Sequence, residues 1–474
     1  MFARVTDSVV RFVLGESESR HWCGNESWIE QKGENMANHK KARNPDHVRR
    51  VNVPGPQDEA VQARFQELLD PAIDAQSAYY RSLGLRERIL NLPMMVAAIL
   101  ALLWRQIPSV CELTRTLNRE GVLWMGAVKV SQPALSKRLL TFPAALFEKV
   151  FFSLLPKLGE RWQARQRPLP ASIVRARQSF THIYAVDGST LEAIFRKLRA
   201  LQESPVGALA GKICTVIDLA TRLPQQIWYT ADALAHDTHF EANILSMVQV
   251  GTLWIFDRGF YDFAFFDDLL DRGGHFITRL KSNAVFQVQS VLSHSSEVRD
   301  RLITLGGLNG TCRHTLRLIE VQFGSHCYRY LTSVLDPQVL PASVVADLYR
   351  RRWRIEEAFF TVKRLLNLAY LWTGSLNGVL LQVWATWLFF ALLVDLGDAV
   401  AEELMLPFDR ISLEMVFRGL YHFSQARRRG QASDPIKYLT APENRDLGIV
   451  KRLRTKPPPL PSPLPALSFS PSSA

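Results

Sequence analysis

The spacing of apolar residues divides the chain into segments of different character. From about residue 56 to 175 the apolar positions recur at the three- and four-residue spacing of amphipathic helices, and the alternation typical of strands is scarce. This pattern predicts a helical domain over 56–175. Near residue 180 it changes to short apolar runs that end at polar turn residues, which indicates strands.

The segment 176–281 predicts an α/β layer. The expected strands are 182–186, 212–218, 225–230, 252–256 and 275–279, and the expected helices are about 238–248 and 261–271. Hairpin-length connections between the first three strands, followed by helical crossovers, predict a mixed sheet with flanking helices.

A strand-rich stretch over 282–343 follows, in which 317–323 and 328–334 alternate around Gly324-Ser325 as in a hairpin. It predicts an inserted β subdomain. Helices resume over 344–400, which together with 176–281 forms the expected α/β domain, and a basic helical segment covers 401–455. The ends are an irregular basic lead-in over 1–55 and a Pro/Ser-rich tail over 456–474 that cannot pack a core.

Two apolar stretches are best explained as buried helices. Leu92–Trp104 is too short to span a bilayer, and Val379–Val394 is nearly long enough but contains Gln382 and Thr386. Residues 1–15 lack the continuous apolar core of a secretory signal, and the five cysteines show no C-x-x-C spacing. These features favour a cytoplasmic protein without a disulfide framework or a zinc ribbon.

The net charge favours a polyanionic partner. Lys and Arg number 57 against 45 Asp and Glu, a formal charge of +12, and a basic surface attracts nucleic-acid phosphates. Within the helical domain, residues 130–139 resemble a helix presented to a DNA groove, with Ser131 as its cap and Lys137 and Arg138 on the next turn. Any capped surface helix can show the same pattern.

Two aspartates follow apolar strands. Asp187 comes after 182–186 and Asp257 after 252–256, so both are expected at the sheet edge where α/β folds bind ligands. The alternative is that Asp-Gly-Ser and Asp-Arg-Gly are ordinary turns, since Asp is a common turn former.

A polar and basic stripe is expected on the helix over 349–363. On a regular α-helix, Tyr349, Arg352 and Lys363 all fall within roughly 40° of Glu356, whereas Glu357 lies about 100° away. A solvated ladder of ion pairs would show the same charges at four-residue spacing. If one glutamate joins the stripe, it is Glu356.

Tyr349, Arg352, Glu356 and Lys363 fit the signature Y-x2-R-x3-E-x6-K without a gap. Over about residues 90–425 the sequence thereby resembles the cut-and-paste insertion-sequence transposases. This resemblance implies an RNase H-like fold with an Asp-Asp-Glu triad, in which Asp187 and Asp257 are the first two acids and Glu356 the third.

The resemblance also implies the chemistry. Asp187, Asp257 and Glu356 would be catalytic and hold two Mg²⁺ ions, with Mn²⁺ as a substitute, because such ions activate a nucleophile and stabilise a leaving oxygen. Tyr349, Arg352 and Lys363 would contact DNA. The implied partners are double-stranded DNA, as terminal inverted repeats and as target, and a second copy of the chain in a synaptic homodimer; a hairpin intermediate is implied only by analogy.

Three other interpretations stay open at this point. A metal-dependent nuclease of the same fold would cut without joining, and a DNA-binding regulator would use the helical domain while the acids served structure. A membrane protein is the third.

Overall fold

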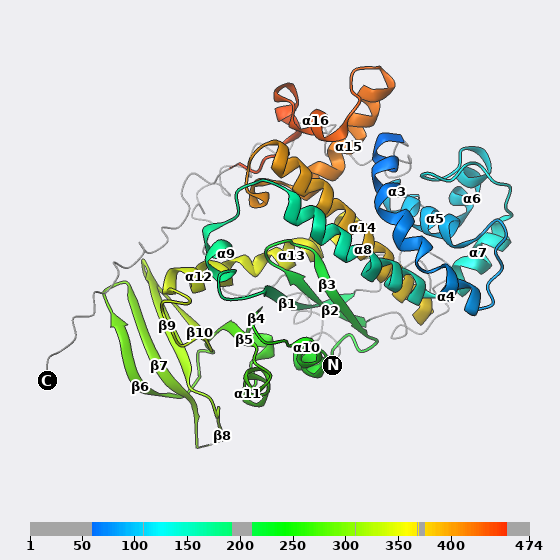
Figure 1. Ribbon diagram of the computed structural model, residues 1–474. Helices are drawn as coiled ribbons and strands as arrows, with labels where there is room; N and C mark the ends of the chain where they lie inside the picture. The colour runs from blue at the N-terminus through cyan, green and yellow to red at the C-terminus, as the bar shows by residue number, and fades with distance from the viewer. Residues whose placement is uncertain are drawn as a thin grey trace, which may run out of the picture. The chain divides into compact units, whose positions relative to one another are not determined.

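The computed structural model describes residues 59–107, 109–191, 211–308, 310–366, 368 and 375–452 (Figure 1). The expected lead-in over 1–55 and the expected tail over 456–474 lie outside these residues. So does the connection 192–210 between the first two strands. At 19 residues it is longer than a hairpin loop, so the expectation of a hairpin-length connection between these two strands is wrong.

Helices fill the described residues from 59 to 176, as their apolar spacing predicts. They are α3 (Glu59–Asp74), α4 (Ser77–Ser82), α5 (Leu92–Trp104), α6 (Val110–Arg119), α7 (Gln132–Thr141), α8 (Ala144–Ala164) and α9 (Ala171–Ala176). Polar side chains define several starts: Asn91, Ser109 and Ser131 each accept a hydrogen bond from the backbone N–H three residues on.

Helix α7 is the one that the sequence suggested for a DNA groove. Its Leu135 and Leu139 are buried, and the Arg138 guanidinium donates a hydrogen bond to the Tyr80 hydroxyl. Lys137 is the exposed member of the basic pair. Of the two basic residues expected to face DNA, Arg138 therefore contacts Tyr80 within the protein instead.

The strands form one mixed sheet. They are β1 (His182–Leu191), β2 (Gly211–Asp218), β3 (Pro224–Thr230), β4 (Thr252–Phe256), β5 (His275–Arg279), β6 (Phe286–His294), β7 (Val298–Gly307), β8 (Gly310–Thr311), β9 (Leu316–Phe323) and β10 (His326–Thr332). Their order is β3-β2-β1-β4-β5-β10-β9-β7-β6, with β8 beside β7. The β1–β4 and β4–β5 pairs are parallel and the others antiparallel, which confirms the expected mixed sheet.

The strand-rich stretch after residue 281 continues this sheet. Strand β10 pairs antiparallel with β5, with Tyr330 opposite Arg279, and β9, β7 and β6 follow outward. Without β10 the outer edge of β5 would leave its backbone N–H and C=O groups unpaired. The stretch expected as an inserted β subdomain thus continues the sheet of the preceding segment.

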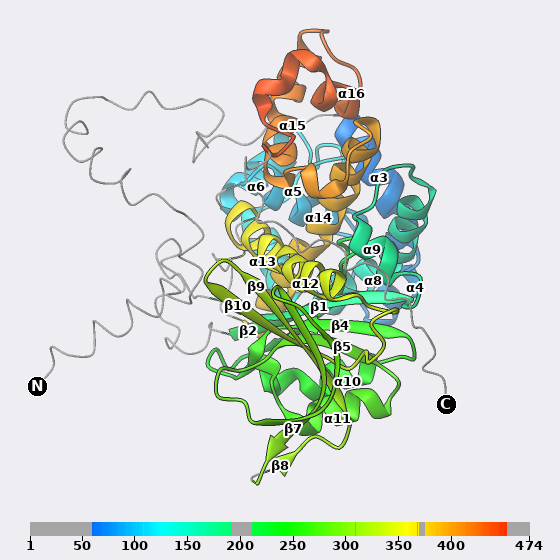
Figure 2. The ribbon, with the colours of Figure 1, turned by 90° about the vertical axis from the view of Figure 1, so that its left-hand side faces the viewer.

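Alternation along β1 gives the sheet two buried faces. Ile183 and Ala185 join the apolar cluster that includes α12 (Ala342–Arg351) and α13 (Trp353–Phe360), whereas Tyr184 and Val186 join the cluster that includes α10 (Glu241–Met247) and α11 (Phe263–Asp271). Figures 1 and 2 show these helix pairs on opposite sides of the sheet. Short helical turns η4 (Asp237–Phe240) and η5 (Arg258–Phe260) precede α10 and α11.

The remaining helices surround α14 (Leu376–Glu403). After the π-helical turn η6 (Thr361–Leu365), α14 packs on α5 and α8 and on the C-terminal α15 (Leu413–Arg428) and α16 (Pro435–Thr440), with η7 (Phe408–Arg410) and η8 (Pro442–Leu447) between and after them. By length and composition α14 could cross a membrane, but 94% of its most apolar window is buried among these elements. Ring contacts such as Phe65–Phe389, at 5.7 Å between centroids, occur on it. The expectation of a buried helix here is confirmed.

Candidate functional site

Asp187 and Asp257 lie side by side on neighbouring strands. The parallel pairing of β1 with β4 ends at Val186 opposite Phe256, so each aspartate follows the last paired residue of its strand. Adjacent strands lie about 4.8 Å apart, and side chains in register point to the same face. Two residues 70 positions apart are thus neighbours on the sheet.

Asp187 does not lie in a turn. The sequence placed the strand end at Val186, but β1 continues to Leu191 because β2 remains its antiparallel partner through Gly211. Only the pairing with β4 stops at Val186. Asp187 therefore lies within β1, paired with Thr215 on β2 but with no partner on β4. Because side chains alternate along a strand, it lies on the same face as Ile183 and Ala185, which α13 covers.

Asp257, in contrast, also serves its own turn. Its Oδ1 accepts a hydrogen bond from Gly259 N at 2.7 Å and so caps η5. The turn interpretation is correct for this residue. The Oδ2 atom of Asp257 takes no part in this capping hydrogen bond.

Arg352 joins the first acid to the glutamate. Its Nη1 donates to Asp187 Oδ2 at 2.9 Å, and its Nη2 donates to Glu356 Oε1 at 2.7 Å. The side chains of Arg352 and Asp187 are 12% and 14% exposed, so the pair is shielded from solvent, while Glu356 at 30% is more open. Helix α13 brings Glu356 here because it packs on β1 and β2.

Burial and mutual repulsion disfavour the charged forms of Asp187 and Glu356. Burial raises the pKa of Asp187 to about 7, with further repulsion from Asp257, Glu356 and Asp237, although Arg352 opposes the rise. Burial also raises the pKa of Glu356, again against the attraction of Arg352. Carboxyl groups whose charged forms are disfavoured are typical of sites that bind a cation or perform acid–base chemistry.

Tyr349 lies beside the same guanidinium. The Arg352 guanidinium carbon is 5.9 Å from the Tyr349 ring centroid, and that ring packs on Tyr330 at 5.5 Å between centroids. Burial raises the pKa of the Tyr349 phenol, and nearby Asp257 adds to the rise. The tyrosine, arginine and glutamate expected on one face therefore lie together with both aspartates.

Lys363 is reached through a helix over 349–363 that is not regular. Arg352 separates α12 from α13, with hydrogen bonds of i to i+3 type on both sides of it, and Thr361–Leu365 forms a π-helical turn. The assumption of about 100° per residue fails at both places. Lys363 Nζ donates instead to Thr190 O at 2.5 Å, three residues beyond Asp187 on β1.

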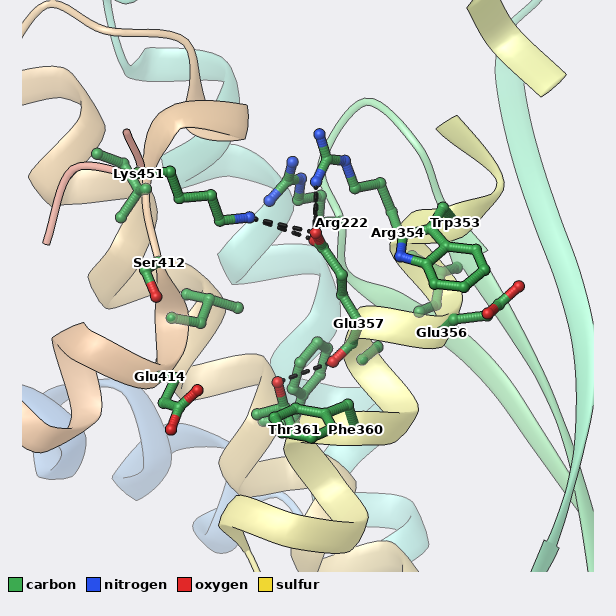
Figure 3. A pocket seen from close by; sticks show the side chains of 15 residues that line it. Arg222, Trp353, Arg354, Glu356, Glu357, Phe360, Thr361, Ser412, Glu414 and Lys451 are labelled. Atoms are coloured by element: carbon green, nitrogen blue, oxygen red, sulfur yellow. Dashed lines mark hydrogen bonds and ion pairs between the residues drawn. The ribbon is translucent and has the colours of Figure 1, made fainter. Parts of the chain in front are cut away.

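Glu357 belongs to a different cluster, as its angular offset predicts. It pairs with Arg354 at 2.7 Å and with Lys451 at 3.3 Å. A pocket of about 480 Å³ opens here, lined by Glu356, Glu357 and residues of the C-terminal segment but not by Asp187 or Asp257. In Figure 3 Glu357 points towards Arg354 and Lys451, while Glu356 points away from them.

The donor chemistry of the acids suits a hard divalent cation. Carboxylate oxygens are the ligands that Mg²⁺ prefers, and the repulsion among Asp187, Asp257 and Glu356 would be relieved by positive charge. As their side chains stand, the described residues contain no group of three His, Cys, Asp or Glu arranged to enclose an ion. The Arg352 guanidinium holds two of the acids instead.

Two further groups lie near the acids, and the sequence reasoning missed both. Asp237 and Lys212 pair at 2.7 Å next to Gly188 and Gly259. Asp237 precedes an expected helix, but only tertiary structure shows that it reaches both acid-bearing segments.

The second group is Arg279, the last residue of β5, and Lys281, two residues on, at the sheet edge that carries Asp257. They lie over the rings of Tyr328 and Tyr261 at 5.6 and 4.8 Å, and neither pairs with a carboxylate of the described residues. The sequence did not reveal this pair, because only the parallel pairing of β5 with β4 places it at the same edge as Asp257.

Asp187, Asp257, Glu356 and Arg352 therefore form one cluster of charged side chains on a mixed sheet. Residues 179–393, which include all of these groups, match the family described as "Transposase DDE domain". The resemblance to insertion-sequence transposases is confirmed at the level of this domain match. The match does not distinguish the Y-R-E-K subtype.

Two curated relatives carry corresponding names. The "Probable transposase for insertion sequence element IS5377" of Geobacillus stearothermophilus is 26% identical over 186 residues, 38% of this chain and 48% of the relative, so the match spans about half of that protein. The "Putative transposase y4zB" of Sinorhizobium fredii is 24% identical over 254 residues, 48% of this chain and 70% of the relative.

Among solved structures, a piggyBac transposase synaptic complex with hairpin DNA aligns with a TM-score of 0.36 and 11% identity, over 83% of this chain and 87% of that one.

Proposed function

We propose that this protein is a Mg²⁺-dependent DNA transposase that cleaves the ends of a mobile element and joins the 3′ ends to target DNA. The observation that carries the proposal is the meeting of Asp187, Asp257 and Glu356 around Arg352, inside the region that matches a transposase DDE domain. Three acids from two strands and a helix suit phosphodiester chemistry, which needs charge neutralisation rather than a protein nucleophile.

We assign the catalytic domain to the RNase H-like class. The order β3-β2-β1-β4-β5, with an antiparallel first half and a parallel second half, supports the assignment, as does the position of Asp187 and Asp257 at adjacent strands. The α3–α9 region is proposed as the domain that binds the DNA ends, and β6–β10 as an insertion that extends the catalytic sheet.

Asp187, Asp257 and Glu356 would hold the metal ions, two Mg²⁺ or Mn²⁺, which when bound would activate the attacking oxygen and stabilise the leaving one. The raised pKa of Asp187, to about 7, means that the proton and the cation compete for its carboxylate. Metal binding is therefore expected to strengthen as the pH rises through about 7.

Arg352 would serve both the acids and the DNA. Its two terminal nitrogens pair with Asp187 and Glu356, and its buried Nε has no hydrogen-bond partner among the described residues. A phosphate oxygen is a suitable acceptor for such a donor. Tyr349, which packs against the guanidinium, would fix its orientation, and Lys363 would contact the DNA backbone farther along β1.

The proposed partners are terminal inverted repeats and target DNA, handled by a homodimer in the synaptic complex. Arg279 and Lys281, without a described carboxylate partner at the acid-bearing edge, support a path for the phosphate backbone across β5. Aromatic rings beneath both cations keep them extended without neutralising them.

The variant Glu356→Gln tests the assignment. We expect it to abolish Mg²⁺-dependent cleavage of a plasmid that carries the gene with its flanking DNA, because a neutral amide is a poor metal ligand, while binding to the same DNA stays within about threefold, below 1 kcal/mol. The matched control is Glu357→Gln, one residue away in the Arg354–Lys451 cluster. It should still cleave, and full cleavage by Glu356→Gln would refute the assignment.

Joining separates a transposase from a nuclease of the same fold. Labelled, pre-cleaved ends are incubated with the wild-type protein, Mg²⁺ and a supercoiled target. We expect the label to move into the target; cleavage without any transfer would favour the nuclease.

A further inference from the structure

A fourth carboxylate lies between the two acid-bearing segments. Asp237 begins η4, and its side chain packs against Gly188, the residue after Asp187, and against Gly259, two residues after Asp257. A Cβ on Gly188 would overlap Asp237 Oδ1, and a Cβ on Gly259 would overlap Oδ2; the Asp237 Cγ would be 3.2 Å from either.

Neither glycine has a positive φ, so conformation does not require glycine at these positions. Close approach does, since only the absence of a Cβ admits the Asp237 carboxylate to both segments.

Lys212 holds this carboxylate in place. Its Nζ lies 2.7 Å from Asp237 Oδ1 and donates a hydrogen bond to Ala235 O at 2.7 Å. One ammonium group therefore contacts both the first residue of η4 and the backbone two residues before it. The side chains of Lys212 and Asp237 are 13% and 20% exposed. The Lys212 stem also lies beside Gly188, where a Cβ would come within 2.9 Å of it.

We propose that Asp237 is a positioning residue that sets the spacing between Asp187 and Asp257. Its Oδ1 is taken by Lys212 and packs on the β1 segment, and its Oδ2 packs on the η5 turn, so the carboxylate acts as a spacer rather than as a metal ligand. The inference rests on the proposed function, because the spacing matters only if both aspartates hold the same ions.

Metal binding without DNA provides the test. Mn²⁺ affinity of the full chain is measured by electron paramagnetic resonance for Asp237→Asn, Asp237→Ala and the control Asp268→Ala, an exposed acid on α11. Asn has the shape of Asp and keeps a side-chain oxygen beside Lys212, so we expect Asp237→Asn to bind within about twofold of wild type, below 0.5 kcal/mol. Asp237→Ala should bind about tenfold more weakly, since the spacer is lost, and Asp268→Ala should match wild type.

Gly259→Ala provides an independent route to the same defect. Its methyl group would displace the Asp237 carboxylate and would also come within 2.9 Å of Asp257 Oδ1, so it should weaken Mn²⁺ binding at least as much as Asp237→Ala does. If the two residues act as one unit, the double variant should lose no more than the worse single variant. Should Asp237→Ala fail to fold by circular dichroism, Gly188→Ala beside Asp237→Asn carries the test, because its Cβ would meet Asp237 Oδ1 and the Lys212 stem.

Wild-type affinity in Asp237→Ala would overturn the proposal. A loss in Asp237→Asn as large as in Asp237→Ala would also overturn it, because charge rather than shape would then matter. These results differ from failure of the proposed function, in which the wild-type protein itself binds no Mn²⁺ or binds it equally well after Asp187→Asn.

Discussion

At the scale of single residues, the buried charge of Asp187 is only partly compensated, which lowers stability but leaves a carboxylate able to bind a cation. Asp187 is buried next to other acids, and its only described hydrogen-bonding cation, Arg352, is shared with Glu356. Fully compensated charges would make a tighter fold. The incomplete compensation leaves carboxylates that would gain from a divalent cation, which is the property that the proposed function requires.

This imbalance predicts a pH-dependent stability. The pKa of Asp187 is about 7 in the folded chain and about 3.9 in an unfolded one. Between these values the folded state retains a proton that the unfolded state releases, so the free energy of unfolding of the metal-free protein should fall as pH rises from about 4 to 7. We expect Asp187→Asn to remove part of this decline, on the order of 1–3 kcal/mol.

Urea unfolding in EDTA at pH 5 and pH 8 measures the effect. Saturating Mg²⁺ should restore part of the lost stability of the wild type at pH 8 and do less for Asp187→Asn. Superimposable pH profiles of the two proteins would show that the Asp187 carboxyl does not cause the fall in stability with pH.

At the scale of elements, the carboxyl ends of parallel strands collect the charged groups. Strands β1, β4 and β5 present Asp187, Asp257 and the pair Arg279 and Lys281 along one edge. Arg279 and Lys281 thus lie along the same edge as the two aspartates, and neither pairs with a carboxylate of the described residues. This separation suits a strand of DNA whose phosphates bind to the cations while one phosphodiester meets the acids.

We therefore expect Arg279→Ala and Lys281→Ala each to weaken DNA binding and to lower the slope of log affinity against log salt by about 1, the value for one lost phosphate contact. Fluorescence anisotropy with a labelled duplex from about 50 to 200 mM salt measures both quantities. The control is Arg313→Ala, an exposed arginine that already pairs with Asp271 at 2.7 Å. An unchanged salt slope in both test variants would place the DNA elsewhere.

Elements were predictable from the sequence wherever their signal was local. Strands at 252–256 and 275–279 have the expected bounds, because continuous apolar runs end there at polar turns. The extension of β1 to Leu191 and the pairing of β10 with β5 were not predictable, since each depends on a partner strand far away in the sequence.

The same distinction holds for the site. Asp187, Asp257 and Glu356 each had a local signal, a strand end or a motif, and the structure brings them together. The π-helical turn that carries Lys363 was not predicted, because no local signal marks it. Asp237 had no signal at all, because its two contacts join segments that meet only in the folded chain.

At the scale of the whole molecule, buried ion pairs connect the α3–α9 region to the central helix α14. Asp398 accepts from Arg165 at 2.8 Å and from Arg167, and Asp395 accepts from Arg165 at 2.6 Å. The side chains of Asp398 and Arg167 are 2% and 3% exposed. Such charges contribute to stability only while every partner remains.

Asp398→Ala should therefore destabilise the molecule strongly, because it leaves two buried guanidinium groups with too few acceptors. We expect a loss of about 3–5 kcal/mol in the free energy of unfolding, measured by urea titration at pH 7.5. Glu402→Ala is the control: its carboxylate contacts the same Arg165 at 3.6 Å but is 38% exposed, and an exposed pair is worth about 1 kcal/mol or less. Equal losses in the two variants would mean that burial of the network is not what joins the helical region to α14.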